Sequence, residues 1–125
     1  MKLSARLDGG NRLARLRRYA SSGVIEEALG EAAKRLRDEA MRELQGAAPE
    51  LAPSAVEDEF EISGLANGEG YRVTALSRRA AALEFGTRAV PAQPWFLRAV
   101  ASALPFINHI GRTLVRRLGA PSRSW

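Results

Sequence analysis

The sequence around Asn67-Gly68 constrains the fold most strongly, because it predicts a β-hairpin of defined register. Residues 56–62 alternate between apolar and acidic side chains, and residues 71–75 form a second alternating run. Asn-Gly is typical of a type I′ turn, in which both central residues have positive φ angles. A two-residue turn at this dipeptide pairs Ile62 with Val73 and brings the two apolar sets onto one face. The predicted hairpin therefore has an apolar face that another element must cover.

A long amphipathic helix is predicted to cover that face. Apolar residues recur every three or four positions from Ile25 to Leu44, which is the spacing of a helix with one buried side. Ser21-Ser22-Gly23 precedes the pattern and offers a helix start. Gly46 and Pro49 end it.

A second helix is predicted from Pro94, since proline is favoured in the first turn of a helix. Helical spacing of apolar residues continues from Phe96 to Leu118. Pro105 lies inside this pattern and is expected to kink or split the helix. Residues 119–125 are expected to form a flexible tail.

Two shorter extended segments and a short helix complete the expected order. Residues 2–7 alternate in polarity and are predicted to form a strand, and residues 81–85 are predicted to form another. Leu13 and Leu16 mark one face of a short helix. The order β-α-α-β-β-β-α predicts the α+β class, a small antiparallel sheet with helices packed on it. The length of 125 residues predicts a single domain over residues 1–125.

The residue types present argue against several classes of site. The chain has no cysteine, which excludes disulfides, thiolate metal sites and cysteine nucleophiles. His109 is the only histidine, and nothing near it in the sequence suggests a pair of a base and a nucleophile. The acidic residues between Glu57 and Glu61 are interpreted as a solvated strand face rather than a metal site. No apolar run approaches the roughly 18 residues needed to cross a bilayer. We therefore expect no catalytic residues, metal, cofactor or membrane contact.

Residues 80–99 carry the most unusual pattern, two short motifs that flank a loop. The motifs are Ala80-Ala81-Ala82-Leu83-Glu84-Phe85-Gly86-Thr87 and Pro91-Ala92-Gln93-Pro94-Trp95-Phe96-Leu97-Arg98-Ala99. Gly86 follows a predicted strand, which favours either a positive φ angle or a close approach of another backbone segment. Thr87 is expected to hydrogen-bond the turn.

The charged and aromatic residues of these motifs have two interpretations each. Glu84 is either a solvated carboxylate or the anchor of a salt bridge, within the protomer or to a neighbour. Phe96 fits the apolar stripe of the predicted helix. Trp95 is adjacent to it, and exposed tryptophan often anchors interfaces, so Trp95 is the better interface candidate. Packing of Trp95 beneath the loop is the alternative.

The two motifs resemble the gene-product-ten-like family of minor virion proteins of tailed phages. Members of that family act as head–tail joining or tail-completion proteins, and similar proteins occur in prophages and gene-transfer particles. The looser resemblance covers nearly the whole chain, with one departure: Glu50-Leu51-Ala52-Pro53 replaces the Thr-Gly step that usually follows the Ala-Pro loop.

The resemblance implies a structural virion protein of the neck, assembled in the bacterial host cytoplasm. Its partners would be other neck or tail proteins, with a homo-oligomeric ring and contact with DNA in the neck channel as further expectations. The expected interface residues are Glu84, Phe85, Gly86, Thr87, Arg88, Pro94, Trp95 and Phe96.

The net charge of +5 supports an alternative function, a small basic nucleic-acid-binding protein. Seventeen of the nineteen basic residues are arginine, a bias that GC-rich coding could also produce. No helix-turn-helix or other DNA-reading motif is recognisable. The candidate DNA-facing residues lie near the two ends of the chain: Arg12, Arg15, Arg17, Arg18, Arg112, Arg116 and Arg117.

Overall fold

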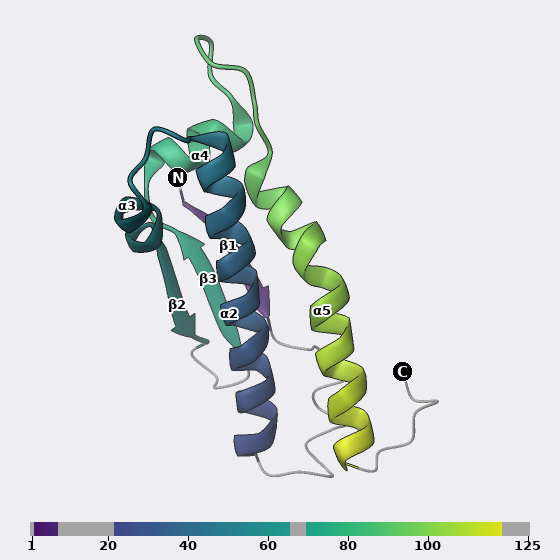
Figure 1. The fold of residues 1–125 in the computed structure, drawn as a ribbon. Coiled ribbons are helices and arrows are strands. Elements are labelled where there is room, and N and C mark those ends of the chain that lie inside the picture. The colour runs from purple at the N-terminus through teal and green to yellow at the C-terminus, as the bar shows by residue number, and fades with distance from the viewer. Residues whose placement is uncertain (1, 8–21, 66–69, 119–125) are drawn as a thin grey trace.

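The computed structural model describes residues 2–7, 22–65 and 70–118 and has the predicted α+β architecture. Figure 1 shows α2 lying across a small sheet, with α3 and β2 on one side of it and α5 on the other. The elements are β1 (Leu3–Leu7), α2 (Ser22–Ala47), α3 (Pro53–Asp58), β2 (Phe60–Gly64), β3 (Tyr71–Ala75), α4 (Arg78–Phe85) and α5 (Trp95–Leu118).

The three strands form one antiparallel sheet in the order β1-β3-β2. In the β2–β3 pair, Ile62 lies opposite Val73, so the register predicted from the sequence is confirmed. Phe60 likewise lies opposite Ala75. The Asn67-Gly68 turn that motivated this register lies outside the described residues.

The apolar face of the sheet packs against α2 and α5. Ala33 and Leu36 of α2, Val73 of β3 and Ala103 of α5 form one buried cluster. α2 begins and ends close to the predicted positions, and Leu44 near its end is also buried. Each leucine-sized side chain that folding removes from water stabilises the fold by about 1.5–3 kcal/mol. The short helix predicted around Leu13 and the predicted C-terminal tail lie outside the described residues.

α5 runs as one helix through Pro105, so it is not split there. Figure 1 shows that the helix bends along its length. Proline lacks the N–H that would bond the carbonyl of Ala101, one turn earlier. Both Ala101 and Pro105 are exposed, so water can satisfy that carbonyl.

Residues 78–85 form the helix α4, so the prediction of a strand over residues 81–85 was wrong. Ser77 precedes α4, and its hydroxyl accepts a hydrogen bond from the N–H of Ala80 at 3.1 Å. This is an N-cap, which stabilises a helix start. The alanines that follow are the strongest helix formers. The sheet therefore has three described strands, and α4 packs beside it.

The predicted strand over residues 56–62 begins later than expected, at Phe60. Residues 53–58 form the short helix α3 instead, with Pro53 at its start, where proline is favoured. Val56 is buried from this helix rather than from a strand, while Glu57 and Asp58 are exposed.

Candidate functional site

The loop between α4 and α5, residues 86–94, is the candidate site and is called the tip loop below. Figure 1 shows that it projects beyond the neighbouring ends of α2 and α5. Residues 87–92 of the loop are all exposed. The two sequence motifs meet at this loop. The contacts that hold the loop therefore determine which motif residues are exposed.

Gly86 starts the tip loop in a conformation that favours glycine. Its φ is 78° and its ψ is 167°, and its N–H donates to the carbonyl of Ala82 at 2.7 Å, which closes α4. A Cβ atom on this residue would lie 2.8 Å from the backbone nitrogen of Ala92. Both features predicted for Gly86, a positive φ and a close backbone approach, are therefore confirmed.

Thr87 holds the turn at the end of the loop. Its N–H donates to the carbonyl of Val90 at 2.8 Å. Its hydroxyl oxygen accepts hydrogen bonds from the N–H groups of Ala89 at 3.2 Å and Val90 at 3.1 Å. The predicted role of Thr87 in the turn is confirmed, and Arg88 lies exposed within that turn.

Glu84 anchors the base of the loop by capping α5. Its carboxylate accepts hydrogen bonds from the backbone N–H groups of Phe96, at 2.6 Å, and Leu97, at 3.4 Å. The first N–H groups of a helix lack partners within the helix, and they favour a negative charge. Nearby, the N–H of Gln93 donates to the carbonyl of Leu83 at 2.7 Å. Glu84 therefore acts as a helix cap, a role that neither interpretation of the sequence included.

Replacing Glu84 with alanine should lower the free energy of unfolding by about 1 kcal/mol, because the cap of α5 is lost. Glu84→Gln keeps an acceptor oxygen and should lose less. Urea denaturation followed by circular dichroism measures both changes. Equal stability of Glu84→Ala and the wild-type chain would contradict the capping role.

Trp95 is a core residue, so the alternative that it packs inside the protein is confirmed and the interpretation as an exposed interface residue was wrong. Its side chain is 0% exposed, and its indole N–H donates to the carbonyl of Ala80 at 3.0 Å. Its ring meets those of Phe60 and Phe96 edge to face, with centroid distances of 5.8 Å and 5.4 Å. Phe96 is buried as well, at 7% exposure, and likewise does not face outward. Pro94, just before α5, is half-buried.

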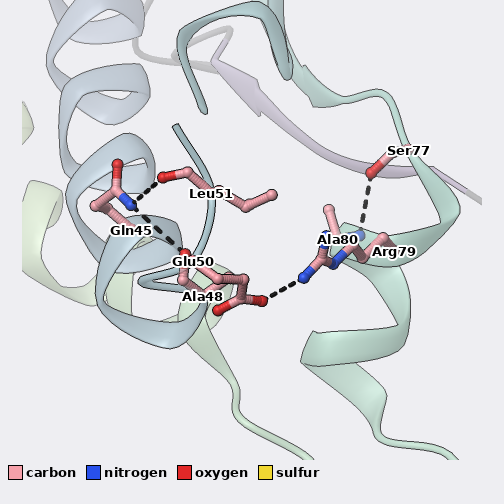
Figure 2. A network of polar contacts seen from close by, with 7 residues as sticks. All are labelled: Gln45, Ala48, Glu50, Leu51, Ser77, Arg79 and Ala80. Carbon is pink, nitrogen blue, oxygen red and sulfur yellow. Dashed lines mark hydrogen bonds and ion pairs between the residues drawn. The ribbon is translucent and has the colours of Figure 1, made fainter. Parts of the chain in front are cut away.

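The other end of α4 is tied to the segment that follows α2, as Figure 2 shows. Arg79 of α4 forms an ion pair with Glu50. The side-chain amide of Gln45, near the end of α2, donates to the carbonyl of Leu51 in that segment at 2.9 Å. α4 therefore has polar contacts at both of its ends.

Glu59 adds a further attachment just before α4. Its carboxylate accepts the N–H groups of Leu76 at 2.9 Å and Ser77 at 2.8 Å, and the hydroxyl of Ser77. Glu59 therefore departs from the predicted solvated acidic face, on which Glu57 and Glu61 remain exposed.

Three large apolar side chains remain exposed at the tip loop and its base. Phe85 is 61% exposed, Leu97 is 64% exposed and Val90 is 41% exposed. We call these residues, with Arg88, the tip patch. The sequence pattern named Phe85 and Arg88 but not Leu97 or Val90. The exposure of Leu97 could have been predicted from the sequence, because Leu97 follows Phe96 directly and so lies outside the apolar stripe of α5.

The arginines proposed to face DNA are not brought together with the tip patch. Arg112 and Arg116 are exposed on α5, far along the helix from the loop. The other candidates have no described side chain: Arg12, Arg15, Arg17, Arg18 and Arg117. His109 is exposed.

The described residues include neither a metal-ligand cluster nor a membrane-spanning helix. No three His, Asp or Glu side chains among them are grouped so as to hold a metal ion. No described helix is long and apolar enough to span a membrane. Comparisons with protein-family models, curated proteins and solved structures found no match to this chain.

Proposed function

We propose that the chain is a non-enzymatic structural subunit of the head–tail junction of a tailed phage, prophage or gene-transfer particle. In this proposal it acts by binding another neck or tail protein through the tip patch. The resemblance of residues 80–99 to head–tail joining proteins motivates the proposal. The observation that carries it is a projecting loop, held rigidly at its base, that keeps Phe85 and Leu97 exposed.

The anchoring of the loop supports a binding role because an ordered loop loses little conformational entropy on docking. Thr87 holds the turn and Glu84 holds the base, and these hydrogen bonds favour an ordered tip loop. Exposed aromatic and aliphatic side chains beside an arginine are typical of the centre of a protein interface.

The composition of the tip patch indicates the chemistry of its partner. Arg88 is the only charged residue between Phe85 and Leu97. The complementary surface is therefore an apolar recess, bordered by a carboxylate that can pair with Arg88.

The double substitution Phe85→Ser, Leu97→Ser should abolish joining of heads to tails and leave the chain folded. Both side chains are exposed, so the change in stability should stay within about 0.5 kcal/mol. The measurement is complementation: the gene is deleted from the phage or lysogen that encodes it, a variant is supplied, and joined particles are counted by electron microscopy.

The matched control is Lys34→Ser on the exposed side of α2, which should complement fully. Full complementation by the double variant would remove the tip patch from the proposal. Complete, infectious particles made without any copy of the chain would overturn the proposed function itself.

Nucleic-acid binding remains the alternative function, and one observation favours it. α5 contains no acidic residue, and Arg112 and Arg116 are exposed on it. Binding of the purified chain to duplex DNA, weakening steeply as salt rises, would support this alternative.

A further inference from the structure

Acidic and basic residues are segregated along the chain. Residues 43–71 contain seven acidic residues and no basic one. Residues 85–125 contain six arginines and no acidic one. A mixed surface would distribute both signs, so this segregation creates two surfaces of opposite charge wherever the fold separates the segments.

The fold places parts of these two segments, α3 with β2 and the helix α5, on opposite sides of α2. Strand β2 is at one edge of the β1-β3-β2 sheet, and α3 directly precedes it. Figure 1 shows α3 and β2 on one side of α2 and α5 on the other. We call Glu57, Asp58 and Glu61 the acidic edge, and Arg112 and Arg116 the basic edge; all five side chains are exposed.

Among residues 2–7, 22–65 and 70–118, no ion pair neutralises either edge. The ion pairs found in the described part of the chain join other residues, such as Arg98 to Glu43 and Arg79 to Glu50. Arg112 and Arg116 are four residues apart on α5 and therefore lie on the same face of the helix. Like charges held together in this way favour a partner of opposite charge.

We propose that the basic edge of one copy binds the acidic edge of a second copy, head to tail. The two edges are different surfaces, so every copy in such a pair keeps one edge free for the next. An interface of this kind closes into a ring when its rotation allows. This pairing extends the proposed assembly function, but it uses neither the tip patch nor any other virion protein.

Apolar residues beside both edges can add to the contact. Leu104, two turns before Arg112 on α5, is 47% exposed. On the other edge, the exposed residues of α3 include Pro53 and Ala55, which are small enough to allow close approach. An apolar centre with a charged rim is the usual arrangement of a protein interface.

The test is the molar mass of the purified chain over a range of concentrations, measured by sedimentation equilibrium. The wild-type chain should associate at low salt and dissociate at about 1 M salt, where the Debye length is about 3 Å. Reversing the basic edge (Arg112→Glu, Arg116→Glu) or the acidic edge (Glu57→Arg, Asp58→Arg) should weaken association at least about tenfold. Combining all four substitutions in one chain makes the two α3 positions basic and the two α5 positions acidic, and should restore association.

Two controls separate the pairing from a general charge effect. Lys2→Glu with Lys34→Glu changes the net charge as much as reversal of the basic edge, at exposed positions outside both edges, and should leave association unchanged. A mixture of the two edge-reversed variants should associate, since each supplies the edge that complements the other.

Several outcomes would overturn the pairing. These are a wild-type chain that stays monomeric at low salt, failure of the four-site variant to recover association, or an equal loss of association in the Lys2/Lys34 control. Loss of duplex DNA binding on reversal of the basic edge, with association unchanged, would assign that edge to nucleic acid instead. Each of these results leaves the complementation test of the tip patch unaffected, so the two proposals fail separately.

Discussion

Replacing Trp95 with alanine should lower the free energy of unfolding by about 3–5 kcal/mol. The Trp95 ring is completely buried and packs against Phe60 and Phe96, so truncation leaves a large cavity. The carbonyl of Ala80 also loses its hydrogen bond to the indole N–H. Because small domains are stable by only about 5–15 kcal/mol, the variant should be partly or largely unfolded at 37 °C.

Circular dichroism with urea denaturation is the suitable measurement, because Trp125 also contributes to the fluorescence. Trp95→Phe keeps an aromatic ring in the core and should cost less than Trp95→Ala. Phe85→Ala, at the exposed end of α4, is the matched surface control and should change stability by less than about 0.5 kcal/mol. A stable, folded Trp95→Ala chain that only fails to assemble would return Trp95 to the role of an interface anchor.

The predictions that succeeded rest on chemistry local to the chain. The Asn-Gly turn and the alternating runs beside it predicted that Ile62 pairs with Val73. The three-to-four-residue spacing predicted α2. Gly86 and Thr87 were predicted correctly because positive φ angles and turn hydrogen bonds depend on neighbours only a few residues away.

The prediction of a strand over residues 81–85 failed because five residues are too few to distinguish the two-residue period of a strand from the 3.6-residue period of a helix. Alternation of Ala81, Leu83 and Phe85 is compatible with a strand, yet Phe85 is exposed and Ala80 is buried. The deciding contacts are the Ser77 cap and the bond from Trp95 to the carbonyl of Ala80, fifteen residues away. The run of alanines favours a helix, but the prediction relied on the alternating pattern instead.

The role of Trp95 was misjudged because two adjacent helical residues cannot both follow one apolar stripe. Trp95 is the first residue of α5, where the helix has no preceding turn to limit the direction of the side chain. Its ring therefore reaches back to α4, while Phe96 takes the first position of the stripe facing the core. The contact depends on how α4 is placed, and no pattern within α5 alone could predict it.

Gly86→Ala should lower the free energy of unfolding by about 2–4 kcal/mol. With φ at 78° and ψ at 167°, Gly86 occupies a region that side chains disfavour by about 1–3 kcal/mol. The added Cβ would also lie 2.8 Å from the backbone nitrogen of Ala92, so the tip loop must move to relieve the contact. The cost therefore combines backbone strain with distortion of the loop.

The same chemical change at Gly46 is the matched control and should have the opposite sign. Gly46 lies in α2, and nothing lies within 4 Å of the Cβ that alanine would add. Gly46→Ala should therefore stabilise the chain by about 0.5–1 kcal/mol, since alanine loses less backbone entropy in a helix. Urea denaturation measures both variants, and the rate of trypsin cleavage after Arg88, followed by mass spectrometry, should rise only in Gly86→Ala. If Gly86→Ala matched Gly46→Ala in both measurements, the tip loop would not depend on glycine at position 86. The order inferred for the tip patch would then have to come from Glu84 and Thr87 alone.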